Sequence, residues 1–167
     1  DEDDLSREDR LKVQLQTLTR HEERLQKNRI ACYASSQRIY SNGYSVTSYA
    51  IGSNGEEVPH GPAMALYLLA YERRKGWYYG AGTPSSSLMI KKELLLKVGG
   101  FDNTLRRVED VDLAVRLALA NCYFVGSPEI LVERHMTQSG YKSADNNLIA
   151  EQHLVQKHSK FLLKRGL

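Results

Sequence analysis

The sequence predicts a single α/β domain, because segments with strand character alternate with helical segments along all 167 residues. Ile30 to Tyr33 and Tyr123 to Val125 are short apolar runs of the kind that form buried strands. The segment from 109 to 120 is apolar almost all round, and such a helix belongs in a core because it has no wide polar face. At 41% hydrophobic content, the chain can bury a sizeable core.

Charge and cysteine content narrow the functional classes. The formal net charge is +3, and the basic residues form no dense cluster before the C-terminus, which argues against nucleic-acid binding. Cys32 and Cys122 are far apart and have apolar or aromatic neighbours, so we expect buried, reduced thiols in a cytoplasmic protein. The longest apolar run, Ala63 to Tyr71, is too short to span a bilayer, and no signal-peptide pattern is seen. Because residue 1 is Asp, we expect a piece of a longer protein.

Periodicity and turn signals predict the other elements. Ser6 and Asp9 resemble a capping pair ahead of a helix, and Asn42-Gly43 is a strong hairpin-turn signal. The leucines at helical spacing after the capping pair are Leu11, Leu15, Leu18 and Leu25. Further helices are predicted from Pro62 to about Arg74, from Lys92 to Val98 and from Asp145 to about Lys164, and further strands from Tyr123 to Val125 and from Glu129 to His135, with a turn at 126–128.

The last predicted helix is amphipathic. Leu148, Val155 and Leu162 are seven apart on one stripe, and basic residues crowd the end of the helix. Cations suit the negative end of the helix dipole. A second interpretation is peripheral contact with an anionic membrane surface.

Two acidic stretches carry the chemistry. Glu109, Asp110 and Asp112 open the apolar helix, where carboxylates are stabilised by the positive end of the dipole. Asp112 and Arg116 are four apart and can pair. On residue types alone, Glu109 and Asp110 are explained as helix caps. The other stretch, the four acids from Asp1 to Asp4, fits either a solvated end or a bound cation.

These stretches resemble the signature of family 2 glycosyltransferases, which have the GT-A fold. Gly-Gly-Phe-Asp, a short spacer and Glu-Asp-x-Asp-Leu-x-x-Arg-Leu match it over 99–117. Asp1-x-Asp3, followed by Arg-Leu-x-x-Gln at 10–14, matches the Asp-x-Asp motif of the family. Leu5 and Ser6 stand where the family usually has proline or an aromatic residue.

The resemblance implies a partial GT-A-like sandwich, with a mixed sheet flanked by helices, a small antiparallel hairpin and no nucleotide-binding half ahead of Asp1. It implies inverting transfer of a sugar from a nucleotide-diphospho-sugar donor to a hydroxyl of a glycan or lipid-linked acceptor, in polysaccharide or glycoconjugate biosynthesis. By position, Asp110 is the catalytic base. Glu109 then orients the base or touches the acceptor.

The resemblance also implies a divalent cation, Mn²⁺ or Mg²⁺, which hard oxygen ligands suit. Asp1 and Asp3 are the implied ligands, and His135 either completes the metal shell or is a surface residue. The implied acceptor-binding residues are Ser86, Ser87 and Gly100. A Ser-rich turn is otherwise an ordinary connector.

Two further classes stay open. The alternatives to a glycosyltransferase are a non-catalytic binding or assembly module that kept the fold and a metal-dependent hydrolase that uses the same acids. In each case we expect a cytoplasmic protein, or one peripheral at the inner membrane face, with no nucleic-acid partner. We also expect a homo-oligomer, because a partial sheet leaves an edge and apolar surface uncovered.

Overall fold

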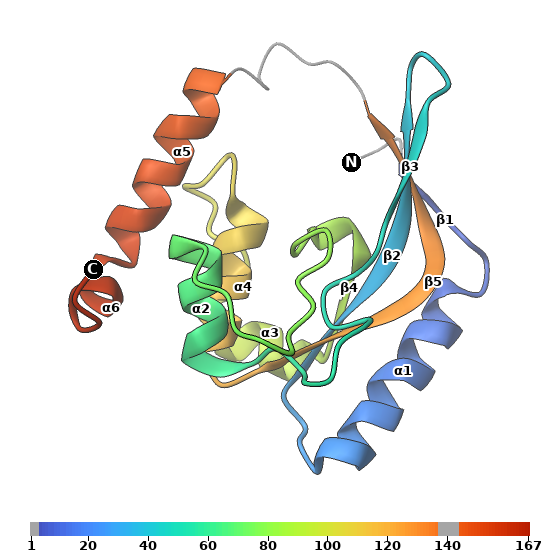
Figure 1. Ribbon diagram of the computed structural model, residues 1–167, viewed down its shortest axis with the longest axis horizontal. Helices are drawn as coiled ribbons and strands as arrows, with labels where there is room; N and C mark the ends of the chain where they lie inside the picture. The colour runs from blue at the N-terminus through green and yellow to red at the C-terminus, as the bar shows by residue number, and fades with distance from the viewer. Residues whose placement is uncertain (1–3, 137–143) are drawn as a thin grey trace.

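A mixed five-stranded sheet organises residues 4–136 and 144–167, the part of the chain that the computed structural model describes (Figure 1). Its central pair, β2 (Ile30–Tyr40) and β5 (Tyr123–Met136), runs parallel. β1 (Leu5–Ser6) pairs with β5, while β3 (Ser45–Ser48) and β4 (Leu88–Ile90) pair with opposite halves of β2, all antiparallel. The predicted α/β class, the mixed sheet and the hairpin, β2–β3, are therefore confirmed.

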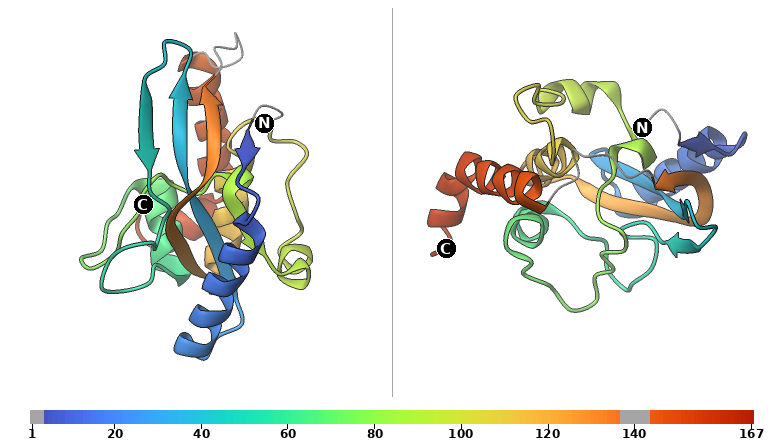
Figure 2. Two further views of the ribbon diagram at one scale, coloured as in Figure 1. Left: turned by 90° about the vertical axis from the view of Figure 1, so that its right-hand side faces the viewer. Right: turned by 90° about the horizontal axis from the view of Figure 1, so that it is seen from above.

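Helices flank the sheet on both sides. α1 (Arg10–Leu25) packs on one face, and α2 (Gly61–Ala70) and α4 (Glu109–Leu119) cover the other (Figure 1). Seen from above, α5 (Ala144–Lys157) lies at the end of the molecule remote from α1 (Figure 2). The remaining helical elements are the 3₁₀ turn η1 (Ser85–Ser87), α3 (Lys92–Lys97) and α6 (Ser159–Leu163).

The larger core lies between the sheet and the α2–α4 pair. Tyr33 and Phe124 stack across neighbouring strands at a centroid distance of 6.2 Å, and Leu113 and Leu117 of α4 are buried against this layer. Every α4 residue from 112 to 118 except Arg116 is buried, which confirms the predicted core helix. A smaller core under α1 includes Cys32.

The helix predicted from the leucine spacing is confirmed as α1, and Leu18 and Leu25 pack on the core, but the first two leucines do not. Leu11 is 69% exposed and Leu15 is 57% exposed, whereas Leu18 is buried beside Gln14 and Thr17. The reason is a polar contact that periodicity does not reveal: the Gln14 amide donates to the carbonyls of Cys32 (3.1 Å) and Ser87 (2.9 Å). Buried carbonyls need such partners, so this face turns inward.

The capping pair predicted ahead of α1 is also wrong in its geometry. Asp9 stands at the N-cap but makes no side-chain cap bond, and its carboxylate instead pairs with Arg7 at 2.6 Å. The N-cap is therefore Asp9, three residues after the Ser6 of the predicted pair.

The turn predicted at 126–128 is a continuation of β5. Two register shifts relative to β2, around Ser35, absorb the extra residues of β5, including Pro128, and irregularities of this kind accommodate proline in a sheet. Gly126 is required there, because a Cβ would lie 2.5 Å from the carbonyl oxygen of Ile51. The serine ahead of the proline is fixed by the Ser35 hydroxyl, which donates to the Ser127 carbonyl at 2.6 Å.

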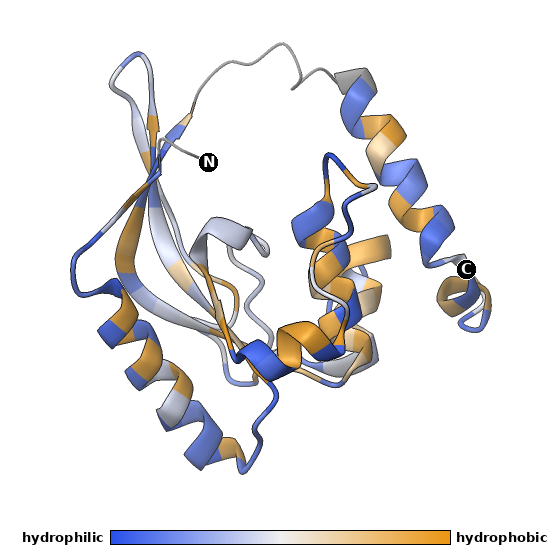
Figure 3. Cartoon of the chain, turned by 180° about the vertical axis from the view of Figure 1, so that it is seen from behind, coloured by the Kyte–Doolittle hydropathy of each residue, from blue (hydrophilic) through white to orange (hydrophobic). Residues whose placement is uncertain are grey.

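One helix ends earlier than predicted, and another is divided in two. α2 stops at Ala70, because Tyr71 adopts the left-handed conformation with φ +56°. The last helix is divided at His158 into α5 and α6, so its apolar stripe does not share one environment: Leu148 is 56% exposed and Leu162 is buried. Figure 3 shows apolar and polar residues alternating along α5.

The cysteine prediction is confirmed, since Cys32 and Cys122 are both free and buried. Burial raises the pKa of the Cys32 thiol to about 12 and that of Cys122 to about 11. Across the described ranges, none of the helices combines the length and apolar character needed to cross a membrane.

Candidate functional site

The N-terminus of α4 begins from a strained backbone. Val108 lies at φ +56°, a left-handed conformation that is an outlier for a β-branched residue. Its carbonyl accepts the Asp112 N–H at 2.8 Å, which fixes the first turn. Strain of this kind costs about 1–3 kcal/mol and gathers at functional sites. The next two residues are Glu109 and Asp110.

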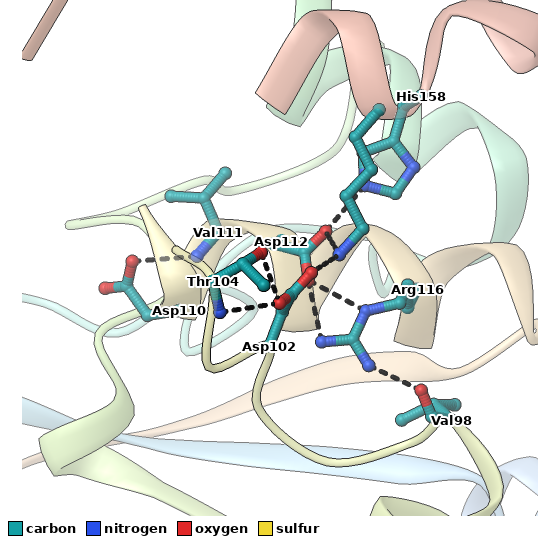
Figure 4. A network of polar contacts seen from close by, with 9 residues as sticks. Val98, Asp102, Thr104, Asp110, Val111, Asp112, Arg116 and His158 are labelled. Atoms are coloured by element: carbon teal, nitrogen blue, oxygen red, sulfur yellow. Dashed lines mark hydrogen bonds and ion pairs between the residues drawn. The ribbon is translucent and has the colours of Figure 1, made fainter. Parts of the chain in front are cut away.

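Asp110 is a half-buried carboxylate at this N-terminus (Figure 4). Burial raises its pKa above the ordinary value, and the neighbouring charge of Glu109 adds to the rise. The Val111 N–H, which donates to Asp110 Oδ1 at 2.7 Å, and the charge of Arg134 act in the opposite direction. The group therefore has a helix-terminal bond and also the raised basicity that proton abstraction requires.

A buried carboxylate two residues further on joins three elements. Asp112 is fully buried and accepts from Arg116 Nε (2.9 Å), Lys157 Nζ (2.9 Å) and His158 Nε2 (2.8 Å). Burial opposes its ionisation, but the bonds from Lys157, His158 and Arg116 outweigh burial, so the pKa of Asp112 lies below the ordinary value. The predicted Asp112–Arg116 pair is confirmed. The link to the C-terminal helices was missed.

The same network extends into the loop before α4 (Figure 4). Lys157 also binds Asp102 at 2.6 Å, and the N–H and hydroxyl of Thr104 donate to the same carboxylate at 2.9 and 2.7 Å. These bonds hold the pKa of Asp102 well below its usual range, and the bond from Lys157 has the largest effect. Arg116 donates in addition to the Val98 carbonyl. The loop that leads to Asp110 is thus held between α4 and α5.

A second group of polar side chains lies where β1 meets β5. Asp4 lies 3.8 Å from Arg134 Nε, a long ion pair. Asp4 Oδ2, Arg134 Nε and His135 Nε2 are buried, and within the described ranges none has a hydrogen-bond partner. Leaving a buried polar atom unpaired costs about 1–3 kcal/mol. The charge of Arg134 also lowers the pKa of Asp110, so it acts on the α4 terminus.

The remaining predicted site residues are the two metal ligands at the N-terminus and the three acceptor-binding residues. Asp1 and Asp3 lie outside the described residues. Ser87 is buried and its hydroxyl donates to the Pro84 carbonyl at 3.1 Å, whereas Ser86 Oγ is buried with no partner among the described residues. Gly100, at φ +65°, donates its N–H to the Leu95 carbonyl and so helps to end α3.

The described residues do not by themselves form a metal centre. No group of three or more His, Cys, Asp or Glu side chains within 4–136 and 144–167 is arranged to hold an ion. Asp4 supplies a carboxylate and His135 supplies an imidazole nitrogen, both with unpaired buried atoms. These two donors fit a divalent cation only if further ligands come from residues outside that range.

Comparison with known proteins gives one partial similarity. An uncharacterized protein of Mycobacterium tuberculosis (strain CDC 1551 / Oshkosh) is 30% identical over 76 residues, which cover 46% of this chain and 23% of that protein. The chain thus spans less than a quarter of the relative that it matches. No family model matches the sequence.

Proposed function

We propose that the chain is the acceptor-binding and catalytic part of an inverting glycosyltransferase of the GT-A type, resembling family 2, with Asp110 as the general base. One observation carries the proposal: a carboxylate of raised pKa at the strained N-terminus of a buried helix. Such strain and such pKa shifts are characteristic of functional sites.

The proposed reaction is a single in-line displacement. Asp110 takes the proton of the acceptor hydroxyl while that oxygen attacks the anomeric carbon of the donor sugar. The bond from this carbon to the nucleoside diphosphate breaks on the opposite side, which inverts the anomeric configuration. Glu109 supports the base through its charge, which raises the pKa of Asp110.

The proposal includes a divalent cation, Mn²⁺ or Mg²⁺, held by Asp1, Asp3 and His135. When bound, such an ion would neutralise the negative charge that develops on the leaving diphosphate. The support within the described residues is His135 Nε2, which is buried and has no hydrogen-bond partner there, and which directly follows Arg134, the residue that pairs with Asp4. A nucleotide-sugar donor and a glycan or lipid-linked acceptor are the corresponding partners.

The test is release of nucleoside diphosphate from a panel of nucleotide sugars, measured with Mn²⁺ and with acceptor glycans. Asp110→Asn should lower turnover ~10²–10⁴-fold, the usual contribution of a positioned base, with little change in donor affinity. Glu109→Gln should have a milder effect, because no proton transfer is assigned to Glu109. Asp9→Asn, at the exposed Arg7 pair, is the matched control.

Three outcomes would contradict the proposal. Full turnover of Asp110→Asn would leave this residue as a helix cap only. Donor cleavage that no acceptor stimulates would indicate a metal-dependent hydrolase. Absence of turnover with every donor, while acceptor glycans still bind, would indicate a non-catalytic module.

A further inference from the structure

A cavity of about 580 Å³ opens beside the β2–β3 hairpin. Arg38, Thr47 and Tyr49 line it from the hairpin side, and Arg73 and Tyr78 line it from the segment after α2. Among the described residues, those that line it include no carboxylate. The mechanism proposed above uses none of these side chains.

The two arginines of this cavity, Arg38 and Arg73, lack an acidic partner within residues 4–136 and 144–167. No ion pair joins either of them to a carboxylate among the described residues, and Arg38 Nε is buried without a hydrogen-bond partner there. The Arg73 guanidinium lies over the rings of Tyr67 (5.8 Å) and Tyr79 (5.4 Å), which fixes its position. A guanidinium presents a planar fork of donors that matches carboxylate and phosphate groups.

The cavity contains both buried aromatic side chains and one tyrosine that is exposed to solvent. Trp77 and Tyr79 are buried, and Tyr79 stacks on Tyr67 at a centroid distance of 3.7 Å. Tyr49, in contrast, is 49% exposed, so its ring is available to a ligand. An aromatic ring offers an apolar face and Tyr a polar tip, and placed polar groups on apolar walls are typical of small-molecule sites.

Strands β2 and β4 relate this cavity to the N-terminus of α4. The segment that lines it runs on into β4, whose Leu88 pairs with Tyr33 of β2. Burial first, and then the charge of Asp110, raise the pKa of Tyr33, so this phenol lies within the electrostatic reach of Asp110. On the same strand, Arg38 is in register with Arg134 of β5. Tyr33, on which the charge of Asp110 acts, and Arg38, which lines the cavity, therefore lie on the same central strand, five positions apart.

We propose that this cavity binds an anionic saccharide, a sugar ring that carries a carboxylate or phosphate, and that it is the acceptor subsite. The role as an acceptor subsite rests on the proposed function, whereas the binding of the saccharide does not. Arg38 and Arg73 bind the anionic group, and Tyr49 packs against the sugar ring. The chemistry shared by uronic acids and sugar phosphates is a compact anion on a polyhydroxylated ring.

Calorimetric titration of the whole chain tests the proposal. The probes are a glucuronic-acid disaccharide, glucose 6-phosphate, the neutral glucose disaccharide and inorganic phosphate. We expect at least one acidic sugar to bind at least tenfold more tightly than both the neutral sugar and phosphate. Arg38→Gln and Arg73→Gln should each weaken this binding about tenfold or more, the usual range for a bond to a charged group. The matched control is Arg20→Gln, in a different cleft.

Tyr49→Ala guards against a folding artefact, because Tyr49 is half-exposed; it should weaken binding of the sugar and leave phosphate unchanged. The uronic-acid and sugar-phosphate arms identify the source of the anion. Equal binding of neutral and acidic sugars, equal binding of phosphate alone, unchanged affinity in both arginine variants, or preferential binding of a single-stranded oligonucleotide would overturn the proposal.

The two proposals fail separately. Asp110→Asn should retain the saccharide affinity while it loses turnover. Saccharide binding without turnover by any form of the protein would remove the transferase and keep the binding site. Turnover that is insensitive to both arginine variants would keep the transferase and remove the acceptor subsite.

Discussion

Val108 shows how one backbone torsion fixes the start of a functional helix. A β-branched side chain at φ +56° is held there only because the elements around it leave no alternative. As a consequence, the first turn of α4 begins at a fixed point, and the carboxylates of Glu109 and Asp110 are held in place.

Val108→Gly should raise the free energy of unfolding and lower turnover. Relief of about 1–3 kcal/mol of strain exceeds the ~0.5–1 kcal/mol entropic cost of glycine, so urea denaturation should show a gain of about 1 kcal/mol. Turnover should fall, because the turn is no longer fixed. Asn121→Gly is the control, since asparagine tolerates its φ of +60°. Equal gains in both variants would argue against special strain at Val108.

Asp110 should lower stability at the pH where it acts. Because burial raises its pKa, the folded state binds the proton more tightly, and stability falls as pH rises from the ordinary value of 3.8 through the folded pKa. Asp110→Asn should therefore be more stable than the native chain at pH 7, and the gain should vanish near pH 3. Denaturation between pH 3 and 8 measures it, and a gain independent of pH would refute the raised pKa.

At the scale of elements, Asp112 attaches the C-terminal helices to α4. Asp112→Asn should lower the free energy of unfolding by about 3 kcal/mol, the lower end for breaking a buried ion pair, since Arg116 and Lys157 keep some contact with water. Amide exchange should show opening of α5 before the sheet. Asp9→Asn, at an exposed pair, should cost less than ~1 kcal/mol. Similar losses in both variants would contradict the role of Asp112.

Acid should release the same attachment. The pKa values of Asp112 and Asp102 both lie below the ordinary value, so their stabilising effect is present above pH 3.8 and is lost as pH falls through the lower folded values. Protection of α5 amides should therefore decline below pH 4. Asp112→Asn should show a shallower decline.

Local patterns predicted the elements well and the contacts between them poorly. The core helix α4 and its Asp112–Arg116 pair follow from spacing within one helix. The bond from Asp112 to His158 joins positions 46 apart, and no local pattern encodes it. The inward face of α1 depends likewise on a carbonyl of β2 that Gln14 must satisfy.

In the candidate site, too, local sequence patterns indicated single residues but not the contacts between distant segments. The choice of Asp110 as the base came from the resemblance and stays a prediction, and the burial that raises its pKa depends on how α4 packs. Arg134 was missed because a single arginine in a strand carries no signal, and it matters only where β5 passes β1 and β2. The arginine cavity was missed for this reason too, since its two sides come from separate segments.

At the scale of the whole molecule, α1 leaves an apolar surface uncovered. Leu11 and Leu15 are exposed on adjacent turns of one helix, and contiguous exposed apolar surface marks sites of association. We predict a homo-oligomer at micromolar concentration, with more than ~1,000 Å² buried. The double variant Leu11→Lys, Leu15→Lys should sediment as a monomer. A native chain that is itself monomeric would exclude this association.

The parallel pair at the centre of the sheet also affects biosynthesis. β2 ends at Tyr40, but its partner β5 ends only at Met136, so the ribosome must add nearly a hundred residues before the pair can close. At ~5–20 residues per second, the delay is on the order of ten seconds. Through this interval, the apolar first half of β2 lacks its longest partner, and we expect newly made chains to depend on chaperones until β5 has emerged.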